Sequence, residues 1–167
     1  MIALKNILVA TDFGESAAVA LAYGRDLART FNARLHVVNV VEDVMMRYSP
    51  EVSFAAPALQ RDLEQGAAKN LERLLTDDDR RTLNVTTAVP TALNIPAAII
   101  DYAKGNAIDL IITGTHGFGP VKHLLMGSVA ERVVRTAPCP VLTVHAKERE
   151  FIVPDADRKS TRLNSSH

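Results

Sequence analysis

The stretch IDLIITGTHGFGPVKHLLMGS (Ile108–Ser128) begins as a short apolar run, continues into a loop with several glycines and leads into a helical pattern. A buried strand followed by such a loop and a helix is typical of a ligand-binding βα unit. Glycine allows unusual dihedral angles and a close backbone approach, and amides at a helix N-terminus attract phosphate. The stretch is not a Walker loop, because Pro120 and Val121 occupy the positions of Lys and Ser or Thr, and it is not G-x-G-x-x-G.

The same alternation of strands and helices continues on both sides of this stretch. Four apolar, β-branched runs predict buried strands: Lys5–Thr11, Arg34–Val41, Ile108–Gly114 and Val141–His145. Asn84–Val89 is a weaker fifth strand. Apolar stripes at helical spacing, with a proline start and a glycine stop for the third, predict four helices: Glu15–Thr30, about Ala58–Leu75, Pro96–Lys104 and about Ser128–Thr136. The pattern predicts a single-domain, open, parallel five-stranded α/β sheet of Rossmann-like type with helices on both faces, and ligand binding at the carboxyl ends of its strands.

The 167 residues are enough for one domain, which we place at residues 1–147. Residues 148–167 are expected to form a C-terminal tail. Within it, DRKSTRLNSSH (Asp157–His167) resembles one reading frame of a common DNA-sequencing adapter, and we exclude it from the fold as an artefact.

Charge and cysteine content exclude several classes of partner. Nineteen basic residues balance nineteen acidic ones, so no overall field favours nucleic acid or a membrane surface, and neither is expected as a partner. The apolar run near the N-terminus is too short to span a membrane. A single cysteine, Cys139, cannot form an intrachain disulfide and fits a reducing, cytoplasmic location.

One long connection, Glu42–Pro57, is rich in exposed-looking apolar residues. Long loops can act as lids or partner surfaces, but many merely connect elements, which favours a variable loop packed on its own domain.

The glycine pattern G-x2-G-x9-G-S is made by Gly114, Gly117, Gly127 and Ser128. Together with ILVATDFGESA, ARLHVVNV, DLIITGTHG and GSVAERVVRTAPCPVLTV, it resembles the ATP-binding branch of the universal stress protein family. The resemblance extends over about Lys5–Val144 and implies an adenine nucleotide alpha hydrolase-like fold. One departure is Ala88, because the family usually has Gly-x-Pro where this chain has Ala88-Val89-Pro90.

The resemblance implies a site for ATP, or for AMP or ADP, with Mg²⁺ accompanying the nucleotide. In that site Val40 would contact the adenine, Asp12 would contact the ribose or the magnesium ion, and the two glycine segments would contact ribose and phosphates. The residues carried over are Ala10, Thr11, Asp12, Val40, Gly114, Thr115, His116, Gly117, Gly127, Ser128 and Val129. The physical chemistry agrees, since Val40 offers an apolar base contact and the loop amides can neutralise phosphate charge.

Each of these residues also has a purely structural interpretation. Asp12 can cap the first helix, Val40 can be a core residue, and the glycines can form a tight turn and an ordinary helix N-cap. We assign no catalytic residue: His116 and His123 have no nucleophile, acid pair or metal cluster placed to work with them.

The final strand would leave an unpaired sheet edge, and the resemblance implies a homodimer formed through Val141–His145. The expected function is that of a dimeric, nucleotide-responsive stress protein with at most slow ATP hydrolysis. The alternatives are an interaction module that binds no nucleotide, and a slow ATPase or nucleotidyl transferase.

Overall fold

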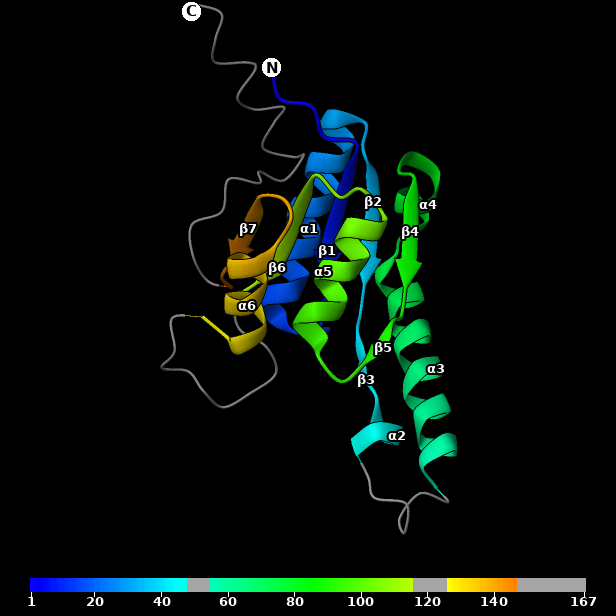
Figure 1. Ribbon diagram of the computed structural model, residues 1–167. Coiled ribbons are helices and arrows are strands. Elements are labelled where there is room, and N and C mark those ends of the chain that lie inside the picture. Colours follow the sequence, from blue (N-terminus) through cyan, green and yellow to red (C-terminus); the bar gives the residue numbers. More distant parts are fainter. Residues whose placement is uncertain (48–54, 116–125, 147–167) are drawn as a thin grey trace, which may run out of the picture.

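A sheet of five parallel strands forms the centre of the molecule, with helices on both faces (Figure 1). The structure, a computed structural model, describes residues 1–47, 55–115 and 126–146. The strands are β1 (Asn6–Ala10), β2 (Arg34–Val38), β4 (Val85–Ala88), β6 (Leu110–Gly114) and β7 (Val141–Val144). The predicted open, parallel five-stranded α/β sheet is confirmed.

The strand order is β4-β2-β1-β6-β7, and every neighbouring pair is parallel. From β1 the chain builds outward through β2 to β4, and it then crosses back to continue on the other side of β1 with β6. Connections that leave two neighbouring strands in opposite directions open a crevice at the carboxyl ends of those strands. This switch point lies between β1 and β6.

Two layers of helices cover the sheet. Helices α1 (Glu15–Phe31) and α3 (Ala56–Leu74) contribute to one core, and α5 (Ile95–Gly105) and α6 (Ser128–Thr136) contribute to the other. Successive strand residues face opposite layers. We name the two clusters the first core (Ile7, Val9, Ala20, Leu21, Tyr23, Ala28, Ala33, Leu35, Val37, Leu71, Leu83, Ile112 and Val144) and the second core (Leu8, Ala10, Val38, Ile99, Ala103, Ile108, Ile111 and Val133).

The predicted helix boundaries are largely confirmed. Helix α1 ends at Phe31, and its C-cap Asn32 has the left-handed conformation (φ 53°) that asparagine tolerates at this position. Helix α5 has Pro96 in its first turn and Gly105 as its last residue, and the Asn94 side chain accepts a 3.0 Å hydrogen bond from the Ala97 N–H. No helix in the described part of the chain is both long and apolar enough to cross a bilayer.

The second strand is shorter than the sequence indicates. We expected a strand over Arg34–Val41, but β2 ends at Val38 and β3 (Val41–Glu42) belongs to a separate two-stranded parallel sheet with β5 (Thr91–Ala92). Val40 therefore lies between two strands. The expectation that it is a residue of the second strand is wrong.

Two short helices were not predicted, α2 (Val44–Arg47) and α4 (Asp77–Thr82). Helix α4 begins with a capping box, in which Thr76 and Asp79 each accept a hydrogen bond from the other's backbone N–H. Helix α2 occupies part of the expected Glu42–Pro57 connection, of which residues 48–54 lie outside the described residues. The predicted tail, residues 148–167, also lies outside them.

Candidate functional site

The switch point brings the ends of three strands together. In the sheet register, Ala10 at the end of β1 pairs with Val38 of β2 on one side and with Thr113 of β6 on the other. The residues at and just beyond these strand ends are therefore neighbours at the carboxyl edge. They include five of the predicted site residues: Thr11, Asp12, Val40, Gly114 and Thr115.

The loop from β1 to α1 is held by its own side chains. The Thr11 hydroxyl accepts a 3.0 Å hydrogen bond from the Phe13 N–H, and the Asp12 Oδ1 accepts a 2.8 Å hydrogen bond from the Gly14 N–H. Between them Phe13 has a φ of 66°, a left-handed conformation that costs free energy in an aromatic residue. No residue type at this position predicts a left-handed conformation.

Asp12 thus has a structural role at the helix start. Gly14 is the N-cap residue of α1, and no side chain caps the helix there. Asp12 instead accepts a hydrogen bond from the N–H of the N-cap residue itself, Gly14. Its Oδ1 therefore has a role similar to the helix cap that the structural interpretation proposed. The same bond holds the half-buried carboxyl group at the carboxyl edge.

Gly114 is the last residue of β6, and helix α1 takes up the space beside it. A Cβ at this position would lie 2.7 Å from the Ser16 Cβ and 2.9 Å from the Ser16 carbonyl carbon. No described glycine has a positive φ. A glycine is therefore required here by the close approach of α1, whereas the sequence had suggested a tight turn or a ligand contact.

The second glycine segment is joined to β6 through Thr115. The Thr115 N–H donates to the Val144 carbonyl (2.8 Å), and the Thr115 carbonyl accepts from the Gly127 N–H (2.6 Å). Thr115 of the first glycine segment and Gly127 of the second are therefore in direct contact. His116 and Gly117, predicted between them, lie outside the described residues.

Gly127 is the N-cap of α6, and no side chain of the described residues caps this helix start. Ser128 is exposed, whereas Val129 is partly buried against the second core. Val40 packs against the same core from the other side of the switch point. Uncapped amides, a hydroxyl and two valines thus border the carboxyl edge, and they could contact an anion and an apolar ring system.

Ala88, the departure from the family pattern, causes no visible distortion. It is the last residue of β4, its φ is not positive, and its carbonyl accepts a 3.2 Å hydrogen bond from the Asn39 N–H. Ordinary strand geometry at this position accommodates an alanine.

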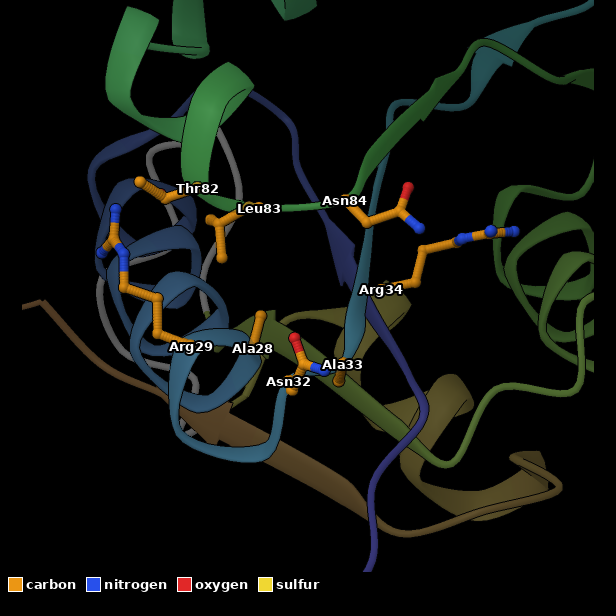
Figure 2. A pocket seen from close by; sticks show the side chains of 8 residues that line it. All are labelled: Ala28, Arg29, Asn32, Ala33, Arg34, Thr82, Leu83 and Asn84. Carbon is orange, nitrogen blue, oxygen red and sulfur yellow. The ribbon is translucent and has the colours of Figure 1, made fainter.

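A pocket at the opposite, amino edge of the sheet is separate from this site (Figure 2). It is lined by Ala28, Arg29, Asn32, Ala33, Arg34, Thr82, Leu83 and Asn84. Arg29 and Arg34 lie on opposite sides of it, and Arg29 is already paired with Asp78 and Asp79. None of the predicted site residues that the structure describes lines this pocket.

The sequence matches the universal stress protein family over residues 3–145. The chain belongs to the universal stress protein family. A universal stress protein of Thermus aquaticus is 38% identical to it over 141 residues, which cover 84% of this chain and 98% of that protein. The solved universal stress protein UspA from Lactobacillus plantarum aligns with a TM-score of 0.76 and 26% identity, over 86% of this chain and 99% of that one.

Two further solved universal stress proteins are described as nucleotide complexes, one with cAMP and one, from Archaeoglobus fulgidus, with dAMP. They are 22% and 18% identical to this universal stress protein, each with a TM-score of 0.55. They cover 87% and 86% of its chain, and it covers 100% and 99% of theirs. At this level of identity the likeness concerns the fold.

Proposed function

We propose that this universal stress protein binds an adenine nucleotide, in the first place ATP with Mg²⁺, at the carboxyl edge of its sheet. The observation that carries the proposal is the meeting of three segments at the switch point between β1 and β6. Thr11–Asp12, Gly114–Thr115 and Gly127–Ser128 are connected there by sheet pairing and by the hydrogen bond from Gly127 to Thr115. Open α/β sheets bind ligands at this position.

The residues fit the parts of a nucleotide. The uncapped start of α6 and the Ser128 hydroxyl can donate hydrogen bonds to phosphate oxygens. The partly buried Val40 side chain offers an apolar surface to the base. Asp12, a carboxylate that would repel phosphate directly, suits a ribose hydroxyl or a magnesium ion that the phosphates also bind.

The nucleotide complexes of the two relatives support the class of ligand. Both cAMP and dAMP carry adenine, a sugar and one phosphate. The G-x2-G-x9-G-S pattern, which provides for a longer phosphate chain in the ATP-binding branch that this sequence resembles, favours ATP among adenine nucleotides. The protein would act in the cytoplasm as a dimeric regulator with at most slow hydrolysis.

Replacing Gly117 by valine and Ser128 by alanine together is expected to weaken binding of ATP with Mg²⁺ at least tenfold. The resemblance assigns Gly117 to the phosphate contacts, so we expect the valine to add bulk where phosphate binds, and the alanine would remove a hydroxyl donor at an exposed position. Isothermal titration calorimetry on residues 1–156 measures the change.

The matched control for this experiment is Thr136→Ala. Thr136 lies at the other end of α6, where its exposed hydroxyl donates to the Arg132 carbonyl, so its removal should leave the dissociation constant unchanged. If the unaltered protein does not bind ATP, the proposal fails. The alternative function, an interaction module that binds no nucleotide, then replaces it.

Replacing Thr143 by proline is expected to convert the protein to a monomer. Within the described residues, strand β7 is an edge strand that pairs only with β6. The carbonyls of Pro140 and Val144 accept hydrogen bonds from β6, so by alternation the Thr143 N–H faces the open edge. Proline removes that donor and blocks pairing with a second copy of β7.

Size-exclusion chromatography with light scattering measures the molecular mass and so distinguishes a monomer from a dimer. Thr143→Val, which keeps the N–H and the β-branched shape, should remain dimeric. A dimer that persists in Thr143→Pro at the same concentration would place the interface elsewhere.

A further inference from the structure

A histidine is buried between the sheet and helix α5. His36 lies in the middle of β2 and is 3% exposed, and its neighbours across the sheet are Leu8 of β1 and Thr86 of β4. Its Nδ1 lies 3.0 Å from the hydroxyl oxygen of Tyr102 in α5, and the two rings meet edge to face with their centroids 5.8 Å apart. The pair of His36 and Tyr102 therefore joins the centre of the sheet to α5.

The other ring nitrogen of His36 is buried without a partner. Its Nε2 forms no hydrogen bond with any described residue. In the neutral ring only one nitrogen carries a hydrogen, and the Tyr102 hydroxyl can donate to Nδ1 or accept from it. In the imidazolium both nitrogens carry a hydrogen, so Nε2–H becomes a buried, charged donor that lacks an acceptor. Protonation of His36 is therefore costly while α5 covers it.

The groups around His36 do not favour the charged ring. Arg34, two residues earlier on the same face of β2, adds a second positive charge, and Tyr102 is the titratable group that α5 places against the ring. Leu8 and Thr86, at the same level on β1 and β4, carry no charge. Burial in the first place, and the charge of Arg34 in the second, lower the pKa of His36 below its ordinary value. The ring is therefore neutral in the folded protein at pH 7.

We infer that His36 and Tyr102 form an acid-sensitive switch, in which protonation of His36 releases helix α5 from the sheet. Release exposes the ring to water, and the strands keep their hydrogen bonds to one another. Helix α5 is held by side-chain packing in the second core, the smaller of the two clusters of buried described residues, and not by sheet pairing. It can therefore leave while the sheet stays folded.

Release of α5 reaches the proposed nucleotide site through α6. The two helices pack against each other, and Val133 of α6 shares the second core with Ile99 and Ala103 of α5. Because the start of α6 borders the site, the site loses support when α5 leaves. This step rests on the proposed function, whereas the release of α5 does not.

Hydrogen exchange of the α5 amides in the nucleotide-free protein tests the switch. Opening exposes His36, whose pKa in water is about 6.5, so the equilibrium constant for opening should rise about three- to tenfold from pH 7.5 to pH 5.5. The protection of the Ile99, Ile100 and Ala103 amides, relative to unprotected amides at the same pH, should fall by this factor. At pH 5.5 these amides should also be less protected than those of α1.

His36→Phe is the first variant, because phenylalanine keeps a ring against Tyr102 and cannot be protonated. The protection of its α5 amides should be the same at the two pH values. Tyr102→Phe is the second variant, and it keeps the titrating histidine but removes the hydroxyl at Nδ1. Its α5 should open more at both pH values and keep the dependence on pH. Carboxyl groups titrate at about pH 4, below this range.

ATP with Mg²⁺ tests the link to α6. If the nucleotide binds only while α5 is in place, ATP at about ten times its dissociation constant should raise the protection of the α5 amides about tenfold at pH 5.5. If ATP binds and leaves this protection unchanged, the link is refuted. If the protein binds no ATP, the proposed function fails and the link fails with it, but the release of α5 is still decided by the exchange without nucleotide.

Three results would overturn the switch itself. The first is α5 protection that does not change with pH in the unaltered protein. The second is an equal change in His36→Phe, or no change in Tyr102→Phe, since another group would then titrate. The third is equal protection of α5 and α1 at pH 5.5, because the whole domain would then unfold together and α5 would not be released alone.

Discussion

Replacing Asp79 by alanine is expected to lower the free energy of unfolding by about 3 kcal/mol, or roughly 6–12 °C in Tm. The Asp79 side chain is 1% exposed and pairs with Arg25 at 2.8 Å and with Arg29 at 3.3 Å. It also accepts a hydrogen bond from the Thr76 N–H. Alanine leaves Arg25, which is itself 22% exposed, without its carboxylate. Urea denaturation at pH 7 measures the loss.

The cost is large because one carboxylate connects two parts of the fold. Arg25 comes from α1 and also donates to the Leu74 carbonyl at the end of α3, whereas Asp79 lies in α4. Without Asp79, the capping box of α4 and its buried ion pairs with α1 are lost, and only the exposed pair of Asp78 with Arg29 remains among the described ion pairs between the two helices.

Asp78→Ala is the control for this prediction. Asp78 pairs with the same Arg29 at 3.0 Å, but its side chain is 56% exposed, so the change should cost less than about 1 kcal/mol. If the two variants lost the same free energy of unfolding, burial of Asp79 would not explain its larger expected contribution.

The acid dependence gives a second readout for Asp79. Burial alone would raise the pKa of this carboxyl, but hydrogen bonds from Thr76 and Arg25 and the charge of Arg25 together lower it. A carboxyl with a lowered folded-state pKa stabilises the fold above its unfolded pKa of about 4, and this contribution is lost as the pH falls through the folded value. The difference in the free energy of unfolding between Asp79→Ala and the unaltered protein should therefore become smaller as the pH falls below about 4.

The sheet was predictable because its signals are local and repeated. Short β-branched runs alternating with apolar helical stripes define a parallel α/β sheet, and Asn32, Pro96 and Gly105 mark helix ends by backbone chemistry. Helix α4 was missed because its sequence, DDDRRT, has no apolar stripe. The capping-box pattern of Thr76 and Asp79 is the sequence signal that could have predicted this helix.

The site was predictable only to the level of its segments. Thr11, Asp12 and Gly114 could be placed at one edge because parallel strands present their carboxyl ends together. The run LHVVNVV looked like one strand, since nothing in a single asparagine shows that its side chain, that of Asn39, donates to the Thr11 carbonyl at the end of the strand. The positive φ of Phe13 was likewise invisible, because the position carries none of the residues that favour it.

Gly114 shows how packing and ligand binding can require the same residue. The space that its side chain would need is filled by Ser16 and Ala17, in the first turn of α1. That turn directly follows Asp12–Gly14, the loop that holds the Asp12 carboxylate. A side chain at position 114 would therefore press on the helix start that positions one border of the proposed nucleotide site.

Replacing Gly114 by alanine is accordingly expected to lower the free energy of unfolding by about 2–3 kcal/mol, because the new methyl group meets the Ser16 backbone at 2.9 Å and backbone cannot rotate away as a long side chain can. Thermal unfolding followed by circular dichroism measures the effect. Gly66→Ala, in the middle of α3 with no atom within 4 Å of the added Cβ, should instead stabilise the protein by about 0.5–1 kcal/mol. If Gly114→Ala proved as stable as Gly66→Ala, α1 could not approach β6 as closely as the structure has it, and the glycine would then be required by the ligand alone.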